Sequence, residues 1–291
     1  MNLKTVDIMT PREDLVTLEL PGTRAEAVEY FKELEFASLP AVVDANGTEE
    51  FRGLVKRTTL ISKPDEERLN HLVEEVPAAS KDLPVKDLAA RMVGADTTSR
   101  SVSLPVVDGR LEGLVTTTDV LEAFATEDPR MANRPVEEAG DHDVCCVDVE
   151  TPLPDAVRHM DSKHSYYALV LDDIDEISGI LTHGDLLRAA QVVKGRIGTG
   201  ASVAGGDDWD WTRINDQIEM LPAKNIELPV VPVSEFMIRE PLTVSSETTL
   251  RKAALIMVGV MADFHVEQLP IVDGDEVEGI VENVDILEYL V

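Results

Sequence analysis

The sequence predicts an α+β fold in which one unit, running strand, helix, strand, strand, helix, occurs four times. Three observations predict it. Short apolar segments end in turn residues and run into a second apolar segment, and a stretch with helical spacing precedes each such pair. A glycine followed by two aliphatic residues opens every second segment, at Gly53, Gly113, Gly179 and Gly279.

Each unit contains a predicted β-hairpin, because alternating apolar strands flank turn residues such as Asn46-Gly47 and Asp273-Gly274. The first strands are expected at 39–44, 104–109, 167–172 and 269–274, and the second at 53–55, 113–115, 179–181 and 279–281.

A helix is expected before each hairpin, over 24–36, 84–93, 154–160 and 249–261. Pro84 and Pro154 suit a first helical turn. Short apolar stretches at 14–18, 143–149 and 241–245 are expected to form the strand that precedes the helix.

These elements divide the chain into four repeats and one insertion. Repeat one is expected at 1–64, repeat two at 65–128, repeat three at 129–190, the insertion at 191–230 and repeat four at 231–291. The insertion is rich in glycine before Trp209 and Trp211, which predicts a mobile loop. The two tryptophans are expected to anchor the insertion or a partner.

The composition indicates an acidic, folded chain. Of 291 residues 44% are hydrophobic, and 56 acidic residues against 26 Lys and Arg give a formal net charge of −30. The acids are spread along the chain, which is typical of proteins in a salt-loving cytoplasm, where the Debye length at 1 M salt is about 3 Å. Such a charge repels nucleic acid, which is bound mainly through Lys and Arg.

A cytoplasmic location is expected, because the chain has no apolar run of about 18 residues for a membrane span and no apolar signal core at its N-terminus. Cys145 and Cys146 are adjacent, a spacing that fits neither a disulfide framework nor a zinc site. We expect them on a buried strand.

A second motif overlaps the recurring glycine in GLVTTTDVLEAF (113–124) and GILTHGDLLRAA (179–190). Thr116 followed by Asp119, and Thr182 followed by Asp185, resemble the capping box that begins a helix. A cap explains one occurrence, but its recurrence in the same place after a hairpin also indicates a binding motif. The two interpretations are compatible.

The stretches 104–124 and 169–190 resemble CBS-domain repeats, and the four repeats are similar in arrangement to the nucleotide-sensing gamma subunit of AMP-activated kinase. The resemblance implies two tandem pairs (Bateman modules), each with pseudo-twofold symmetry, that form a disc within one chain or in a homodimer. It also implies an adenine nucleotide (AMP, ADP or ATP), or in some members S-adenosylmethionine, in clefts between paired repeats. Mg²⁺ is expected only with a polyphosphate nucleotide.

The chemistry of such a ligand suits the motif. One carboxylate can accept both ribose hydroxyls, and the Thr hydroxyl and free N–H groups of a helix start suit a phosphate. Repeat four keeps Asp285 but has Glu282 at the Thr position, where a carboxylate repels phosphate. Repeat one has lost the acid, and its Lys56 and Arg57 are expected to serve phosphates held mainly by repeat two.

Phosphate-binding relatives often carry His or Arg just before the hairpin, and here the basic residues lie one step from those positions. His183, inside the motif, is expected to be an exposed residue at a helix start, and a ligand-binding role is the alternative. The candidate ligand-binding residues are Lys56, Arg57, Arg100, Ser103, Thr116, Asp119, His164, Tyr166, Thr182, Asp185 and Asp285.

Three classes of function remain open. The favoured one is a regulatory sensor without chemistry of its own, which acts on an unknown regulated protein. A scaffold for oligomerisation is the alternative that the degenerate first and fourth repeats favour. An enzyme is least favoured, because no Ser-His-Asp order, HExxH or Walker motif can be placed, and no metal site is expected.

Overall fold

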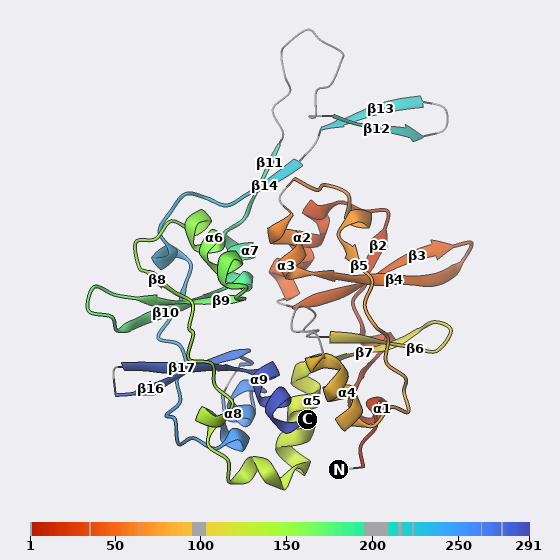
Figure 1. Cartoon of the computed structure of the whole chain (residues 1–291). Coiled ribbons are helices and arrows are strands. Elements are labelled where there is room, and N and C mark those ends of the chain that lie inside the picture. Colours follow the sequence, from red (N-terminus) through yellow and green to blue (C-terminus); the bar gives the residue numbers. More distant parts are fainter. Residues whose placement is uncertain are drawn as a thin grey trace.

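A computed structural model describes residues 2–34, 36–63, 65–94, 103–194, 209–214, 217–222, 224–262, 264–274 and 276–291. Four units lie around a common centre, with repeats one and two on one side and repeats three and four on the other (Figure 1). The helices are α1 (Thr5–Ile8), α2 (Arg24–Leu34), α3 (Arg57–Ser62), α4 (Val85–Val93), α5 (Thr117–Glu127), α6 (Leu153–Lys163), α7 (His183–Ala189), α8 (Leu250–Met257) and α9 (Asn283–Leu290).

The expected hairpins are confirmed in all four units. They are β3 (Ser38–Ala45) with β4 (Thr48–Lys56), β6 (Ser103–Val107) with β7 (Leu111–Thr116), β9 (Tyr167–Leu171) with β10 (Ile177–Thr182), and β16 (Gln268–Asp273) with β17 (Glu276–Glu282). Each hairpin leads directly into a helix, namely α3, α5, α7 or α9.

A short parallel strand precedes the helix and hairpin in repeats one and three. Strand β2 (Leu18–Leu20) pairs with β3, and β8 (Cys146–Asp148) pairs with β9. In repeats two and four the same place is taken by single parallel bridges, Ala79 to Val106 and Val244 to Ile271. The expectation that both cysteines lie on a buried strand holds only in part, because Cys145 is buried but precedes β8, and Cys146 lies in β8 but is half-buried.

Repeats are paired by an exchange of short segments. Strand β1 (Thr10–Pro11) lies on β7 of repeat two, and β5 (Val73–Glu74) lies on β4 of repeat one. Likewise β15 (Ile238–Arg239) lies on β10 of repeat three, and Asp141 bridges to Ile280 of repeat four. The tandem pairs are therefore repeats one with two and three with four.

The exchange explains the recurring glycine. A Cβ atom on Gly113 would lie 2.6 Å from the Thr10 carbonyl oxygen, and one on Gly179 would lie 2.7 Å from that of Ile238. Only glycine lets the crossing backbone approach so closely. The motif glycine is thus required by contact between paired repeats rather than by the hairpin turn.

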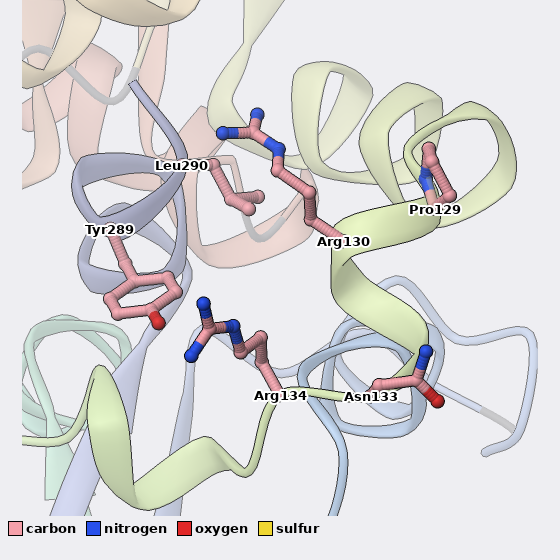
Figure 2. Close-up of a pocket in the computed structure, with 6 residues that line it drawn as sticks. All are labelled: Pro129, Arg130, Asn133, Arg134, Tyr289 and Leu290. Carbon is pink, nitrogen blue, oxygen red and sulfur yellow. The ribbon is translucent and has the colours of Figure 1, made fainter.

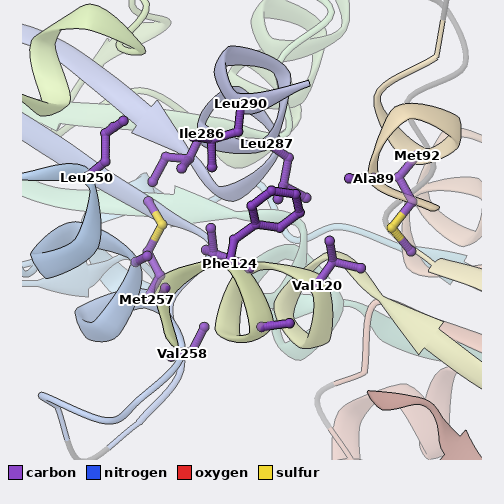
Figure 3. Close-up of a cluster of buried hydrophobic side chains, with 14 of the residues drawn as sticks. Ala89, Met92, Val120, Phe124, Leu250, Met257, Val258, Ile286, Leu287 and Leu290 are labelled. Carbon is purple, nitrogen blue, oxygen red and sulfur yellow. The ribbon is translucent and has the colours of Figure 1, made fainter. Parts of the chain in front are cut away.

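The two pairs meet through their helices. Repeats two and four share one apolar core, in which Phe124 of α5 lies among Leu287, Leu290 and Met257 (Figure 3). Repeats one and three share a smaller contact, in which Leu187 and Ala190 pack into the core of repeat one.

The insertion begins as a ribbon, β11 (Gln191–Lys194) paired with β14 (Lys224–Glu227), and carries a hairpin of β12 (Trp209–Ile214) and β13 (Gln217–Pro222). It projects away from the four units (Figure 1). Trp209 and Trp211 lie in β12, whereas the expected glycine-rich loop falls outside the described residues. In the part of the chain that is described, no helix has the length and apolar character needed to cross a membrane.

Candidate functional site

The Thr-x-x-Asp motifs of repeats two and three form capping boxes at the starts of α5 and α7. Asp119 Oδ2 accepts the Thr116 backbone N–H at 2.7 Å and its hydroxyl at 2.8 Å. Asp185 Oδ2 does the same for Thr182, with both distances 2.7 Å. The hairpin delivers the Thr to the helix start, so each carboxylate is fixed by the local fold.

The two carboxylates differ in what their second oxygen meets. Asp185 is fully buried, and its Oδ1 accepts a hydrogen bond from Arg188. Asp119 is half-buried, and no described residue donates to its Oδ1. Burial raises the pKa of both carboxyl groups above the usual range for Asp. Asp119 is therefore the acid with an acceptor available to a ligand.

Repeat four keeps the same geometry without the Thr hydroxyl. Asp285 Oδ2 accepts the Glu282 backbone N–H at 2.9 Å at the start of α9. Glu282 in place of the motif Thr therefore leaves the cap intact and presents a carboxylate where repeats two and three present a hydroxyl.

A cavity of about 400 Å³ lies at the centre, where repeats one, three and four meet strand β5 of repeat two. The candidate residues that line it are Lys56, Arg57, His164, Tyr166 and Thr182. Ser103, Thr116, Asp119, Asp185 and Asp285 do not line it, and Arg100 lies outside the described residues.

Lys56 and Arg57 do not take the place expected from sequence. The expectation placed them in the cleft of repeat two, but the cavity that they line is shared mainly with repeats three and four, and repeat two supplies Glu74 rather than its motif. Lys56 pairs with Glu74 of the exchanged strand β5 at 2.7 Å, and Arg57 lies 3.6 Å from Glu267 of repeat four. The reason is that α3, which they begin, packs against α7 across the boundary between the two pairs.

The expectation that His183 is exposed was wrong. Its ring is buried, lies 5.8 Å from the Tyr166 ring, and its Nδ1 is 2.9 Å from the Tyr166 carbonyl oxygen. Burial lowers the pKa of His183, which leaves the ring neutral at pH 7.

His183 is buried because it lies at the junction between β10 and α7, and the sequence pattern did not reveal this. His183 directly follows the motif Thr, as Thr117 does in repeat two. Asn283 occupies the matching position in repeat four and donates from Nδ2 to the Thr117 hydroxyl at 3.0 Å. Thr117 and Asn283 thus meet at the boundary between repeats two and four, where the starts of α5 and α9 approach each other. The sequence signal that could have identified this position was its recurrence, because the polar residues Thr117, His183 and Asn283 occupy it in repeats two, three and four.

The central cavity is lined by more carboxylates than permanently charged cations. Besides Lys56 and Arg57, its lining contains four carboxylates: Glu74, Asp161, Glu267 and Glu282. Burial tends to raise the pKa of Glu74, but hydrogen bonds from Lys56 and Thr59 hold it below its usual value. The cavity therefore suits a ligand with little negative charge better than a polyphosphate.

Ser103 has a structural contact. Its hydroxyl is buried and shares a hydrogen bond with that of Ser38, the matching residue of repeat one.

Among the described residues, no group of three His, Cys, Asp or Glu side chains is placed to hold a metal ion.

Comparison with known families identifies three stretches of the chain. The model of the CBS domain matches residues 71–126, 136–192 and 233–291. The protein MJ1404 of Methanocaldococcus jannaschii, which is uncharacterized, is 23% identical over 290 residues. The chain covers only 62% of that relative's length.

Two solved structures resemble the whole chain. MJ1225 of Methanocaldococcus jannaschii, a proposed archaeal homolog of g-AMPK, has a TM-score of 0.75 at 19% identity, covering 99% of this chain and 100% of its own. An uncharacterized conserved protein of Pyrococcus horikoshii has a TM-score of 0.61 at 21% identity, with the same coverage. These likenesses show that the fold of four units is a known arrangement.

Proposed function

Because the chain belongs to the CBS-domain family, we propose that it is a regulatory protein that binds an adenine nucleotide (AMP, ADP or ATP) between its repeats. It has no catalysis of its own in this proposal. Binding changes the relative orientation of the repeats, and an unidentified protein in the cytoplasm responds to that change.

The observation that carries the proposal is the free acceptor of Asp119. Its Oδ2 is committed to the helix cap, while no described residue donates to its Oδ1. A ribose offers two adjacent hydroxyls, which a fixed carboxylate binds through charge-assisted hydrogen bonds. The cap therefore orients the carboxylate and leaves one oxygen for a ligand.

The central cavity supports a second site. Thr182 and the cations Lys56 and Arg57 line one space, so a phosphate there would meet a hydroxyl and two positive charges. Four carboxylates in the same lining oppose each added phosphate. We therefore expect AMP to bind more tightly than ATP, and Mg²⁺ to assist only ATP. The likeness to MJ1225, a proposed homolog of g-AMPK, agrees with a nucleotide-dependent role.

The same acidic lining favours S-adenosylmethionine as the alternative ligand. It shares the adenosine group but carries a sulfonium cation in place of phosphates, and a cation gains from Glu74, Asp161, Glu267 and Glu282.

The test is titration calorimetry at molar KCl with AMP, ATP, ATP with Mg²⁺, and S-adenosylmethionine. The variant is Asp119→Ala/Asp185→Ala. Its matched control is Asp108→Ala/Asp173→Ala, which removes two carboxylates from the exposed turns of the same two repeats.

We expect binding to the wild type and the control, with at least a tenfold loss in the motif variant. Tighter binding of S-adenosylmethionine than of any nucleotide would replace the ligand but keep the site. No heat with any ligand in wild-type protein would overturn the proposal and favour a scaffold.

A further inference from the structure

A second cavity of about 330 Å³ lies away from the motifs, beside the last helix. It is lined by Pro129, Arg130, Asn133, Arg134, Tyr289 and Leu290. The first four belong to the short helix Pro129–Ala132 and the residues after it, which link the two tandem pairs, and the last two end α9 of repeat four (Figure 2). This lining contains two arginines and no acidic residue, on a chain of net charge −30.

The carboxylate of Glu138 already binds two of the residues that line this cavity. Glu138 Oε2 accepts a hydrogen bond from the Tyr289 hydroxyl and lies 3.3 Å from Arg134 Nη1. Arg134 and Tyr289 are therefore spaced so that one carboxylate oxygen reaches both. Glu138 and Arg134 are both exposed, and an ion pair of that kind contributes little to stability, so another anion can displace it.

Arg130 forms the other side of the cavity and is held in place. Its guanidinium bonds both oxygens of buried Asp128, at 2.8 Å from Nη2 and 3.1 Å from Nε. Arg251 Nη2 donates to the Asp128 carbonyl oxygen at 2.9 Å. The hydrogen bond from Arg130 lowers the pKa of Asp128 most, and the charge of Lys86 lowers it further. The charged groups beside this wall therefore include the cations Lys86, Arg130, Arg134 and Arg251 and the carboxylates Asp128 and Glu138.

We propose that this cavity binds a small organic dianion, with one anionic group on Arg134 and Tyr289 in place of Glu138 and the other on Arg130. The shared chemistry is an oxyanion, either carboxylate or phosphate, and guanidinium groups bind both bidentately. Because the linking segment and α9 both line the cavity, a bound dianion would hold them together. The Leu250 backbone N–H, which donates to the Arg134 carbonyl oxygen at 2.8 Å, extends this contact to α8.

The test measures the binding of succinate and of inorganic phosphate to the full chain by calorimetry, at an ionic strength kept constant with KCl. Arg130→Gln/Arg134→Gln removes both cations. The matched control, Arg52→Gln/Arg158→Gln, removes two exposed arginines that also form local ion pairs. Glu138→Gln removes the internal competitor.

We expect succinate to bind wild type, its affinity to fall tenfold or more in Arg130→Gln/Arg134→Gln, and its affinity to stay unchanged in the control. Glu138→Gln should bind several-fold more tightly, a gain that no misfolded variant would produce. Succinate presents two anionic groups and inorganic phosphate only one, so binding of succinate supports the two-group site, whereas binding of phosphate alone would place a single anion there and overturn it. Equal binding of both probes to all four proteins, or no gain in Glu138→Gln, would overturn the proposal and leave the arginines as neutralising partners of Glu138 and Asp128.

Discussion

At the scale of single residues, Asp119 has two roles that one substitution can separate. In Asp119→Asn the amide oxygen can still accept the Thr116 N–H, so the free energy of unfolding should fall by less than about 1 kcal/mol. The amide cannot supply a charged acceptor for ribose hydroxyls, so nucleotide affinity should fall at least tenfold. Urea unfolding and calorimetry on the same protein measure the two effects.

The pH dependence of nucleotide affinity, compared between wild type and Asp119→Asn, tests whether the Asp119 carboxylate binds the ligand. Burial raises the pKa of Asp119 in the folded protein, so the folded state takes up a proton more readily than the unfolded chain. Stability from this group is therefore greatest at low pH and declines as pH rises through the raised pKa, while ligand binding strengthens. Asp119→Asn should lack this change in affinity. An unchanged affinity in the variant would assign Asp119 to the cap alone.

At the scale of elements, the crossing segments make a specific prediction about two glycines. A Cβ atom at Gly179 would lie 2.7 Å from the Ile238 carbonyl oxygen, and one at Gly184 would lie 2.7 Å from Arg57 Nη1. Backbone in a paired strand cannot move aside, whereas a guanidinium can. Gly179→Ala should therefore lower the free energy of unfolding by about 1–3 kcal/mol.

Gly184→Ala is the matched control, because the new contact distance is the same. Its free energy of unfolding should stay within about 0.5 kcal/mol of the wild-type value, since the Arg57 guanidinium can shift and alanine is the better residue in a helix. Urea unfolding curves of the two variants and wild type compare these values. Similar losses in both would show that the crossing strand β15 is not fixed against β10.

The hairpins and helices could be predicted from sequence because their signals are local. Apolar segments, turn residues and helical spacing lie within each unit, so β3 to α3 and the matching elements appear where expected. The exchanged strands β1, β5 and β15 were missed, since each has only two residues and pairs with a distant repeat. A two-residue strand has no periodicity to detect.

At the scale of the whole molecule, the site was only partly predictable for the same reason. The capping geometry of Thr116 and Asp119 follows from their own spacing. The neighbours of Lys56, Arg57 and His183 depend on how one tandem pair packs on the other, which no local pattern encodes. The acidic lining of the central cavity likewise comes from repeats two, three and four. The sequence pointed only to Glu282, because the other carboxylates reach the cavity through the packing of separate repeats.

The net charge of −30 makes stability depend on salt. Repulsion among carboxylates opposes the compact state and is screened as the Debye length falls from about 10 Å at 0.1 M to about 3 Å at 1 M. The thermal unfolding midpoint should therefore rise steadily between 0.1 and 1 M KCl, as followed by circular dichroism. Sucrose at matched osmolality separates screening from solvent exclusion, because it adds no ions. A midpoint that is flat in KCl, or that rises equally in sucrose, would show that the acidic residues do not limit the stability of the fold.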